Sequence, residues 1–140
     1  MLTIELTETI AAPLPSAWAL VSDPREQHRF TAYGVNHVQQ TNASDLGPEF
    51  KWSEQGVLLG KRYECECGVF AWEPPNWFCF GTRNLFHVSF ELDAVEEGVR
   101  LLYRVELPQT PEGRRDAFAE LCRETIDRLK RLLESEAHSE

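Results

Sequence analysis

The feature that most constrains the fold is a series of strand-like segments followed by one long amphipathic segment. In several stretches between Tyr33 and Leu107, apolar residues recur at every second position, the period of a β-strand with one buried face. After Thr110 the spacing becomes helical, in the stripe Phe118, Leu121, Cys122, Leu129, Leu132 and Leu133. A sheet with one apolar face must be covered, and this helix, of about 22 to 25 residues, is the obvious cover.

Turn residues divide the strand-like part of the chain. We expect strands at residues 2–10, 33–41, 50–52, 61–72, 77–82, 86–93 and 99–107. Residues 55–60 are predicted to be a loop, and Pro74-Pro75-Asn76 and Glu96-Glu97-Gly98 to be turns. The whole chain, residues 1–140, is predicted to be a single domain, without a repeat or linker.

Helix signals lie after the first strand and near the end of the chain. A short helix is predicted at residues 14–22, and a second at 24–29, with Asp23 or Ser22 as its cap. Thr110 and Pro111 are expected to open the final helix, and residues 135–140 to be frayed. The prediction is an α+β fold in which a curved antiparallel sheet of about seven strands wraps around a long C-terminal helix.

Charge and hydropathy exclude some partners. The net charge is −9, from 23 acidic and 14 basic residues, so neither nucleic acid nor an anionic membrane surface is an expected partner. No apolar run reaches the roughly 18 residues of a membrane span, so no membrane insertion is expected. Residues 1–10 do not resemble a signal peptide, and the expected location is cytoplasmic.

The four cysteines are predicted to be structural thiols. Cys65 and Cys67 lie two apart on one strand and face the same side, whereas Cys79 is expected opposite Phe70 or Ala71, too far to share an ion. Cys122 falls on the distant final helix, and no C-x-x-C motif is present. We therefore expect no metal site, and no cofactor is predicted.

Three parts of the chain together resemble the START-like (SRPBCC) superfamily, in particular its polyketide cyclase/dehydrase-like branch. They are ETIAAPLPSAWALVSDP at residues 8–24, HVSFELD at 87–93 with EGVRLLY at 97–103, and LKRLLE at 129–134. The resemblance implies a helix-grip fold with a cavity between the sheet and the last helix. Proteins of that superfamily bind lipids, sterols, hormones, polyketides or quinones, and a minority are enzymes, so the resemblance carries over no catalytic residue.

The aromatic inventory supports a site for an apolar ligand, because Tyr and Trp combine a large apolar area with one polar group. The candidate ligand-binding residues are Tyr33, His37, Trp52, Tyr63, Trp77, Phe90, Tyr103 and Phe118. His37 or Tyr103 could also move a proton. Glu54 is a carboxylate without a second acid to pair with, and the sequence contains no recognisable catalytic motif.

The favoured hypothesis is therefore the binding of a small hydrophobic or aromatic molecule, such as a lipid, polyketide or quinone, without catalysis. Two alternatives stay open: an enzyme of the polyketide cyclase/dehydrase type, and a protein-interaction module that holds no small molecule. A solid aromatic core with an exposed apolar patch would favour the interaction module. Homodimerisation through the sheet or the helix also stays open.

Overall fold

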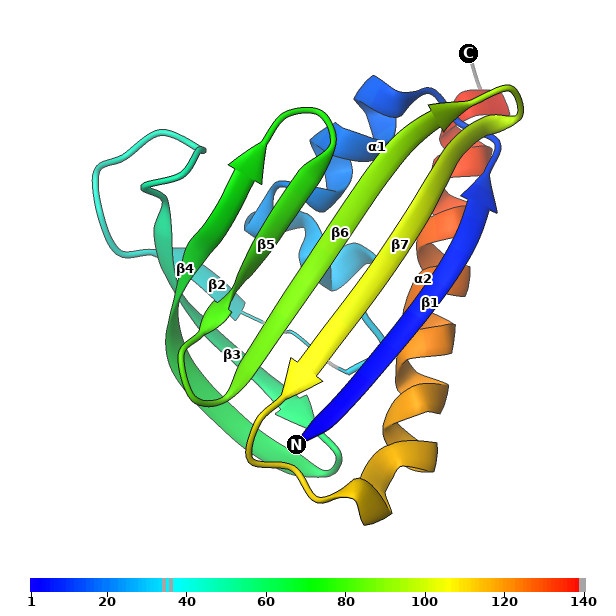
Figure 1. The fold of residues 1–140 in the computed structure, drawn as a ribbon. Helices are drawn as coiled ribbons and strands as arrows, with labels where there is room; N and C mark the ends of the chain where they lie inside the picture. Colours follow the sequence, from blue (N-terminus) through cyan, green and yellow to red (C-terminus); the bar gives the residue numbers. More distant parts are fainter. Residues whose placement is uncertain (34, 36, 139–140) are drawn as a thin grey trace.

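Seven antiparallel strands form one sheet in the order β1-β7-β6-β5-β4-β3-β2 (Figure 1). The computed structural model describes residues 1–33, 35 and 37–138. The strands are β1 (Leu2–Ile10), β2 (His37–Gln40), β3 (Lys51–Leu58), β4 (Lys61–Glu73), β5 (Trp77–Thr82), β6 (Phe86–Val95) and β7 (Gly98–Leu107). From β2 to β7 each strand pairs with the next strand in sequence, and β1 pairs with β7.

One face of the sheet is covered by the helix α2 (Arg115–His138), which runs behind β1 and β7 in Figure 1. Its buried residues are Phe118, Cys122, Thr125, Ile126, Leu129 and Leu133, spaced so that they form one stripe. The short helices α1 (Leu14–Val21) and η1 (Pro24–Arg29, a 3-10 helix) follow β1. The structure thus confirms the α+β architecture predicted from the sequence, with a curved sheet around a long C-terminal helix.

Several predicted boundaries were wrong. Residues 55–58 continue β3 instead of forming a loop, since they pair with residues 61–64 of β4, and only Leu59 and Gly60 make the turn. Thr110 does not cap the last helix, because a 3-10 turn, η2 (Glu112–Arg114), intervenes before α2. Helix α2 also continues to His138, beyond the expected start of fraying. Of the strand predicted at 33–41, only His37–Gln40 is β-structure, and residues 34 and 36 lie outside the described part.

Glu8 interrupts the apolar alternation of β1, and the structure gives the reason. Its carboxylate accepts hydrogen bonds from Arg123 Nη2 at 2.8 Å and from Lys130 Nζ at 3.3 Å, both on α2. An acid on the helix-facing side of β1 therefore ties the sheet to the helix through two ion pairs.

Aromatic side chains fill the middle of the core. Trp52 contacts Phe50 and Phe80, and Phe78 stacks on Phe80 with 5.2 Å between ring centroids. All four are at most 1% exposed. Beyond this packing, a cavity lies towards the end of the sheet where the β3–β4 and β5–β6 turns lie, and this cavity is the candidate site.

Candidate ligand-binding site

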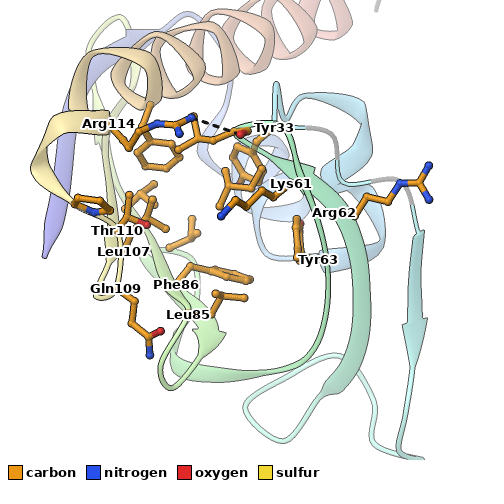
Figure 2. A pocket seen from close by; sticks show the side chains of 16 residues that line it. Tyr33, Lys61, Arg62, Tyr63, Leu85, Phe86, Leu107, Gln109, Thr110 and Arg114 are labelled. Atoms are coloured by element: carbon orange, nitrogen blue, oxygen red, sulfur yellow. Dashed lines mark hydrogen bonds between the residues drawn. The ribbon is translucent and has the colours of Figure 1, made fainter.

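A cavity of about 390 Å³ lies between the end of the sheet and the start of α2 (Figure 2). Its wall comes from the β3–β4 turn, the β5–β6 turn, the end of β7 with the segment that follows it, and the first turns of α2. The inner part is apolar and consists of side chains that are almost fully buried: Phe86, Val88, Val105, Leu107 and Phe118. The mouth is marked by exposed residues: Lys61, Leu85, Gln109, Pro111 and Arg114.

The β3–β4 turn presents two leucines to the cavity at a cost in backbone energy. Leu59 has a φ of 51°, and the following Gly60 has a φ of 83°. Two-residue turns of this left-handed kind favour Asn-Gly, and a branched side chain in the left-handed region costs roughly 1–2 kcal/mol. Leu58 at the end of β3 and Leu59 in the turn both line the cavity. An apolar residue thus occupies a turn position where a polar residue such as asparagine would be more stable.

Behind the cavity wall, a buried carboxyl group is bonded to two aromatic side chains. Glu54 on β3 is 1% exposed, and it accepts hydrogen bonds from Tyr63 Oη at 2.7 Å and from Trp52 Nε1 at 3.2 Å. Trp52 and Glu54 lie on the same face of β3 because strand side chains alternate. Tyr63 also lines the cavity, so it connects Glu54 with the space where a ligand would lie.

Gly56 makes this arrangement possible. It pairs with Tyr63 across β3 and β4. A Cβ atom at position 56 would lie 2.7 Å from the Tyr63 hydroxyl and 2.8 Å from two ring carbons. The tyrosine ring therefore lies across the backbone of Gly56 and can reach Glu54 two residues away.

Tyr33 reaches the cavity from the segment after η1, and helix α2 holds that segment in place. The Ala32 amide donates to Thr125 Oγ1 at 2.9 Å, and Arg128 Nη1 donates to the Thr31 carbonyl at 3.1 Å. Thr125 is fully buried in α2, so the attachment lies inside the protein. The segment carrying Tyr33 is thus attached to α2 through both polar atoms of the peptide group between Thr31 and Ala32.

Tyr103 on β7 stands deeper than Tyr33. It is fully buried, and its hydroxyl has no hydrogen-bond partner among the described residues. Tyr33 lies near enough to influence it electrostatically, without the geometry of a hydrogen bond. The polar cluster comprises Tyr33 and Tyr63 at the cavity wall and Glu54 and Tyr103 behind it, and the buried Tyr103 hydroxyl is unsatisfied.

The ionisation of this polar cluster is governed by burial. Burial raises the pKa of Glu54, although the hydrogen bonds from Tyr63 and Trp52 partly oppose the shift. Burial and the nearby Glu54 charge raise the pKa of Tyr63 and of Tyr33, so both phenols keep their protons. If Glu54 is protonated, it can donate to Tyr63, which leaves the phenolic proton free for a carbonyl oxygen in the cavity.

The structure brings three of the eight predicted ligand-binding residues to the cavity wall: Tyr33, Tyr63 and Phe118. Trp52, Phe90 and Tyr103 are buried in the core behind it. His37 is exposed on the edge strand β2 and does not line the cavity. That any of these residues binds a ligand stays a prediction.

Trp77, the eighth predicted residue, lies elsewhere. Its Nε1 donates to Ser89 Oγ at 2.9 Å, and it lines a second hollow of about 540 Å³. Four of the nine residues around this hollow are charged: Glu73, Glu91, Asp93 and Arg100. This hollow is larger than the cavity beside α2, but its charged wall suits an apolar ligand less well.

The cysteines of the described chain do not join other metal-binding side chains in a cluster. The described residues hold no group of three or more His, Cys, Asp or Glu side chains able to bind a metal ion. Cys79 pairs with Ala71, as expected, and burial raises its pKa to about 11. Cys65 and Cys67 do interact, with 3.7 Å between their sulfur atoms.

Several residues in or behind the cavity wall were not predicted as ligand-binding residues, and the sequence signals for them differ in kind. Trp52, Glu54 and Gly56 lie at every second position of β3 and share its buried face. A strand predicted over the full length of β3 would therefore have placed the Glu54 side chain in the interior. Leu59, Lys61 and Arg114 gave no comparable signal, because Arg114 follows the β-strands by several residues and meets the β3–β4 turn only in three dimensions.

The sheet, the long helix packed against it and the cavity between them define a helix-grip protein. Solved structures with a similar fold align with almost the whole of this chain at low sequence identity. Protein SA2116 from Staphylococcus aureus, of unknown function, superposes with a TM-score of 0.74 at 11% identity, covering 98% of this chain and 96% of its own. No protein-family profile matches the sequence, and no curated protein sequence matches it either.

Two further structures extend the comparison. Ara h 8.0201 gives a TM-score of 0.66 at 13% identity, covering 99% of this chain and 98% of its own. DynU16, a protein of the dynemicin biosynthetic locus, gives 0.63 at 20% identity, covering 96% of this chain and 48% of its own. Identities this low establish a common fold and leave function to be argued from the site.

Proposed function

We propose that this protein binds a small hydrophobic or aromatic molecule in the cavity beside α2. The observation that carries the proposal is the cavity itself, about 390 Å³ in volume, with an inner wall of buried apolar side chains. Its volume falls within the range of small-molecule sites, and polar side chains such as Tyr33 and Tyr63 line it beside the apolar inner wall, as orientation of a ligand requires. DynU16, whose structure has a similar fold, comes from the dynemicin biosynthetic locus.

The backbone of the β3–β4 turn supports the same proposal. Leu59 keeps a left-handed conformation that its side chain disfavours, and the side chain lines the cavity. Leu85, on the β5–β6 turn, is 37% exposed and also lines it. Apolar residues on two turns at one opening are expected when a ligand covers them.

The test is native mass spectrometry of the purified protein, followed by organic extraction and identification of any bound molecule. A panel of lipids, quinones and polycyclic aromatics is then screened by thermal shift and calorimetry. We expect Leu85→Asp to lower the affinity of the best ligand at least about tenfold, because a carboxylate at the cavity wall must be desolvated. The proposal is wrong if the wild type carries no ligand and no compound of the panel binds.

The matched control is Val57→Asp. Val57 is 38% exposed, almost the same as Leu85, and it does not line the cavity. Both variants place the same charge on an exposed apolar position near the same end of the sheet. Val57→Asp should therefore leave ligand affinity unchanged.

An enzyme of the polyketide cyclase/dehydrase type is the second candidate, favoured by the contact between Glu54 and Tyr63. A buried carboxyl group bonded to a phenol at the cavity wall could transfer a proton to or from a ligand carbonyl. Deuterium exchange at the α-carbon of 1-tetralone, followed by NMR, tests this chemistry. Acceleration by the wild type and its loss in Glu54→Gln, with binding retained, would establish an enzyme.

The protein-interaction alternative gains less support from the structure. The large apolar side chains that are exposed are Met1, Val57, Phe70, Trp77 and Leu85 among the described residues. These residues come from different strands and turns. The interaction module was expected to have a completely filled core, whereas this protein has a cavity beside α2.

No described helix is long and apolar enough to cross a membrane.

A further inference from the structure

The protein has a net negative charge, whereas the charged residues that line the cavity are positive. The chain has 23 acidic and 14 basic residues. Yet the residues that line the cavity include Lys61, Arg62 and Arg114, and no aspartate or glutamate of the described chain is among them. An excess of positive charge at one opening of an acidic protein is a local field suited to an anion.

The cations at the cavity mouth also lack the ion pairs found elsewhere. Seven of the 14 Lys and Arg side chains make an ion pair within the described chain: Arg25, Arg29, Arg104, Arg115, Arg123, Arg128 and Lys130. Neither Lys61 nor Arg114 is among them. Arg114 instead donates to the Leu59 carbonyl at 3.4 Å, which uses one of its five N–H groups. Its other donors are available to a ligand.

The position of these two residues distinguishes the mouth of the cavity from its interior. Lys61 follows the β3–β4 turn, and Arg114 lies directly before α2, so the two approach the opening from different elements. In Figure 2 the Lys61 amine is directed into the cavity, whereas the Arg62 side chain points away from it. The inner wall beyond them is apolar, so the cavity has one positively charged end and one apolar end.

Given the binding function proposed above, we infer that the ligand is amphipathic, with an apolar body and one terminal anionic group. The body lies against Phe86, Val88 and Phe118, and the anion is bound at the mouth by Lys61 and Arg114. Arg114 can bind a carboxylate or phosphate oxygen pair through two parallel N–H groups, and Lys61 adds a point charge. Carboxylic acids and phosphate monoesters share this chemistry.

The test compares ligands that differ only in the terminal group. Decanoate, decyl phosphate and decan-1-ol are titrated into the full-length protein by calorimetry at low ionic strength. We expect at least one of the two anions to bind about tenfold more tightly than the alcohol, since exposed charges contribute modestly. That preference should shrink at about 0.5 M salt, where the Debye length falls to a few ångströms. Comparison of the two anions identifies which of them the site selects.

Charge-removing variants then assign the preference to residues. Lys61→Met and Arg114→Met should each lower anion affinity about threefold or more while leaving decan-1-ol affinity unchanged, and the double variant should remove the preference. Arg83→Met is the matched control, because Arg83 is an exposed cation on the β5–β6 turn that does not line the cavity, so its removal should change neither affinity.

The outcomes separate this inference from the proposed function. Equal binding of the anions and the alcohol by the wild type overturns the anionic ligand and leaves the apolar cavity as the binding site. A preference that persists in the double variant also overturns it. Failure of all three compounds, together with an empty ligand screen, contradicts the binding function itself.

Discussion

The Tyr63 hydroxyl donates a hydrogen bond of 2.7 Å to the Glu54 carboxylate, and the two residues belong to adjacent strands of the sheet. Glu54 is buried and Tyr63 lines the cavity, so the bond joins an interior carboxyl group to the candidate site. A buried carboxylate needs such partners, since its desolvation is otherwise uncompensated.

Tyr63→Phe should destabilise the protein by about 1.5–3 kcal/mol, because it removes a hydrogen bond to a buried charged group. Chemical denaturation measures the change. A double-mutant cycle with Glu54→Gln should give a coupling energy of at least about 1 kcal/mol. Additive effects of the two substitutions would show that the carboxyl group adds nothing to this bond beyond what a glutamine oxygen, which can also accept it, provides.

Glu54→Gln should change how stability depends on pH. The pKa of Glu54 is raised by burial above the 4.5 of an exposed glutamate, so the folded state binds its proton more tightly than the unfolded state. The wild type is therefore expected to lose stability relative to the variant as pH rises from about 4.5 through the pKa of the folded state. Denaturation curves of both proteins between about pH 4 and pH 8 test this, and a constant difference would contradict it.

Gly56→Ala should destabilise the protein by about 1–3 kcal/mol, the usual range for overpacking, because the new methyl group would displace the Tyr63 ring. Gly68→Ala is the control, since a Cβ atom at Gly68 meets nothing within 4 Å. Denaturation of both variants measures the difference. Equal stability of the two variants would mean that the ring moves aside without cost.

Leu59→Asn should increase the free energy of unfolding by about 0.5–1 kcal/mol, because asparagine tolerates the left-handed conformation. The same change should weaken binding of an apolar ligand, since Leu59 lines the cavity. Leu58→Asn should weaken binding without the gain in stability, because only Leu59 has the positive φ. Thermal denaturation and calorimetry of both variants separate the two effects.

Glu8→Gln should show the opposite pH dependence to Glu54→Gln. Burial opposes ionisation of Glu8, but bonds from Lys130, the Thr9 amide and Arg123 outweigh it and lower its pKa. The contribution of Glu8 to the free energy of unfolding is therefore present above pH 4.5, and it is lost as pH falls through the lowered pKa of the folded state. The variant should lose about 0.5–1 kcal/mol at neutral pH and converge on the wild type in acid, as denaturation at both pH values would show.

The architecture could be predicted from the sequence because strands and helices each leave a local, periodic pattern of apolar residues. Alternation in Phe86–Val95 and Gly98–Leu107 marks strands with one buried face, and the stripe from Phe118 to Leu133 marks the covering helix. Turn residues at Glu96-Glu97-Gly98 fixed a boundary in the same way. Residues 55–60 were misassigned because Gly56 and Gly60 signal a loop, whereas Gly56 is required within the strand by the ring of Tyr63.

The tertiary structure alone decided which aromatic residues meet the cavity and which fill the core. Tyr63 and Trp52 look equivalent in sequence, since both lie on the buried faces of neighbouring strands, yet one lines the cavity and the other is completely enclosed. Lys61 and Arg114 are 53 positions apart in the chain and share one opening only because α2 begins beside the β3–β4 turn. Periodicity specifies which face of each element is buried; the packing of elements distant in sequence determines where that buried space stays open.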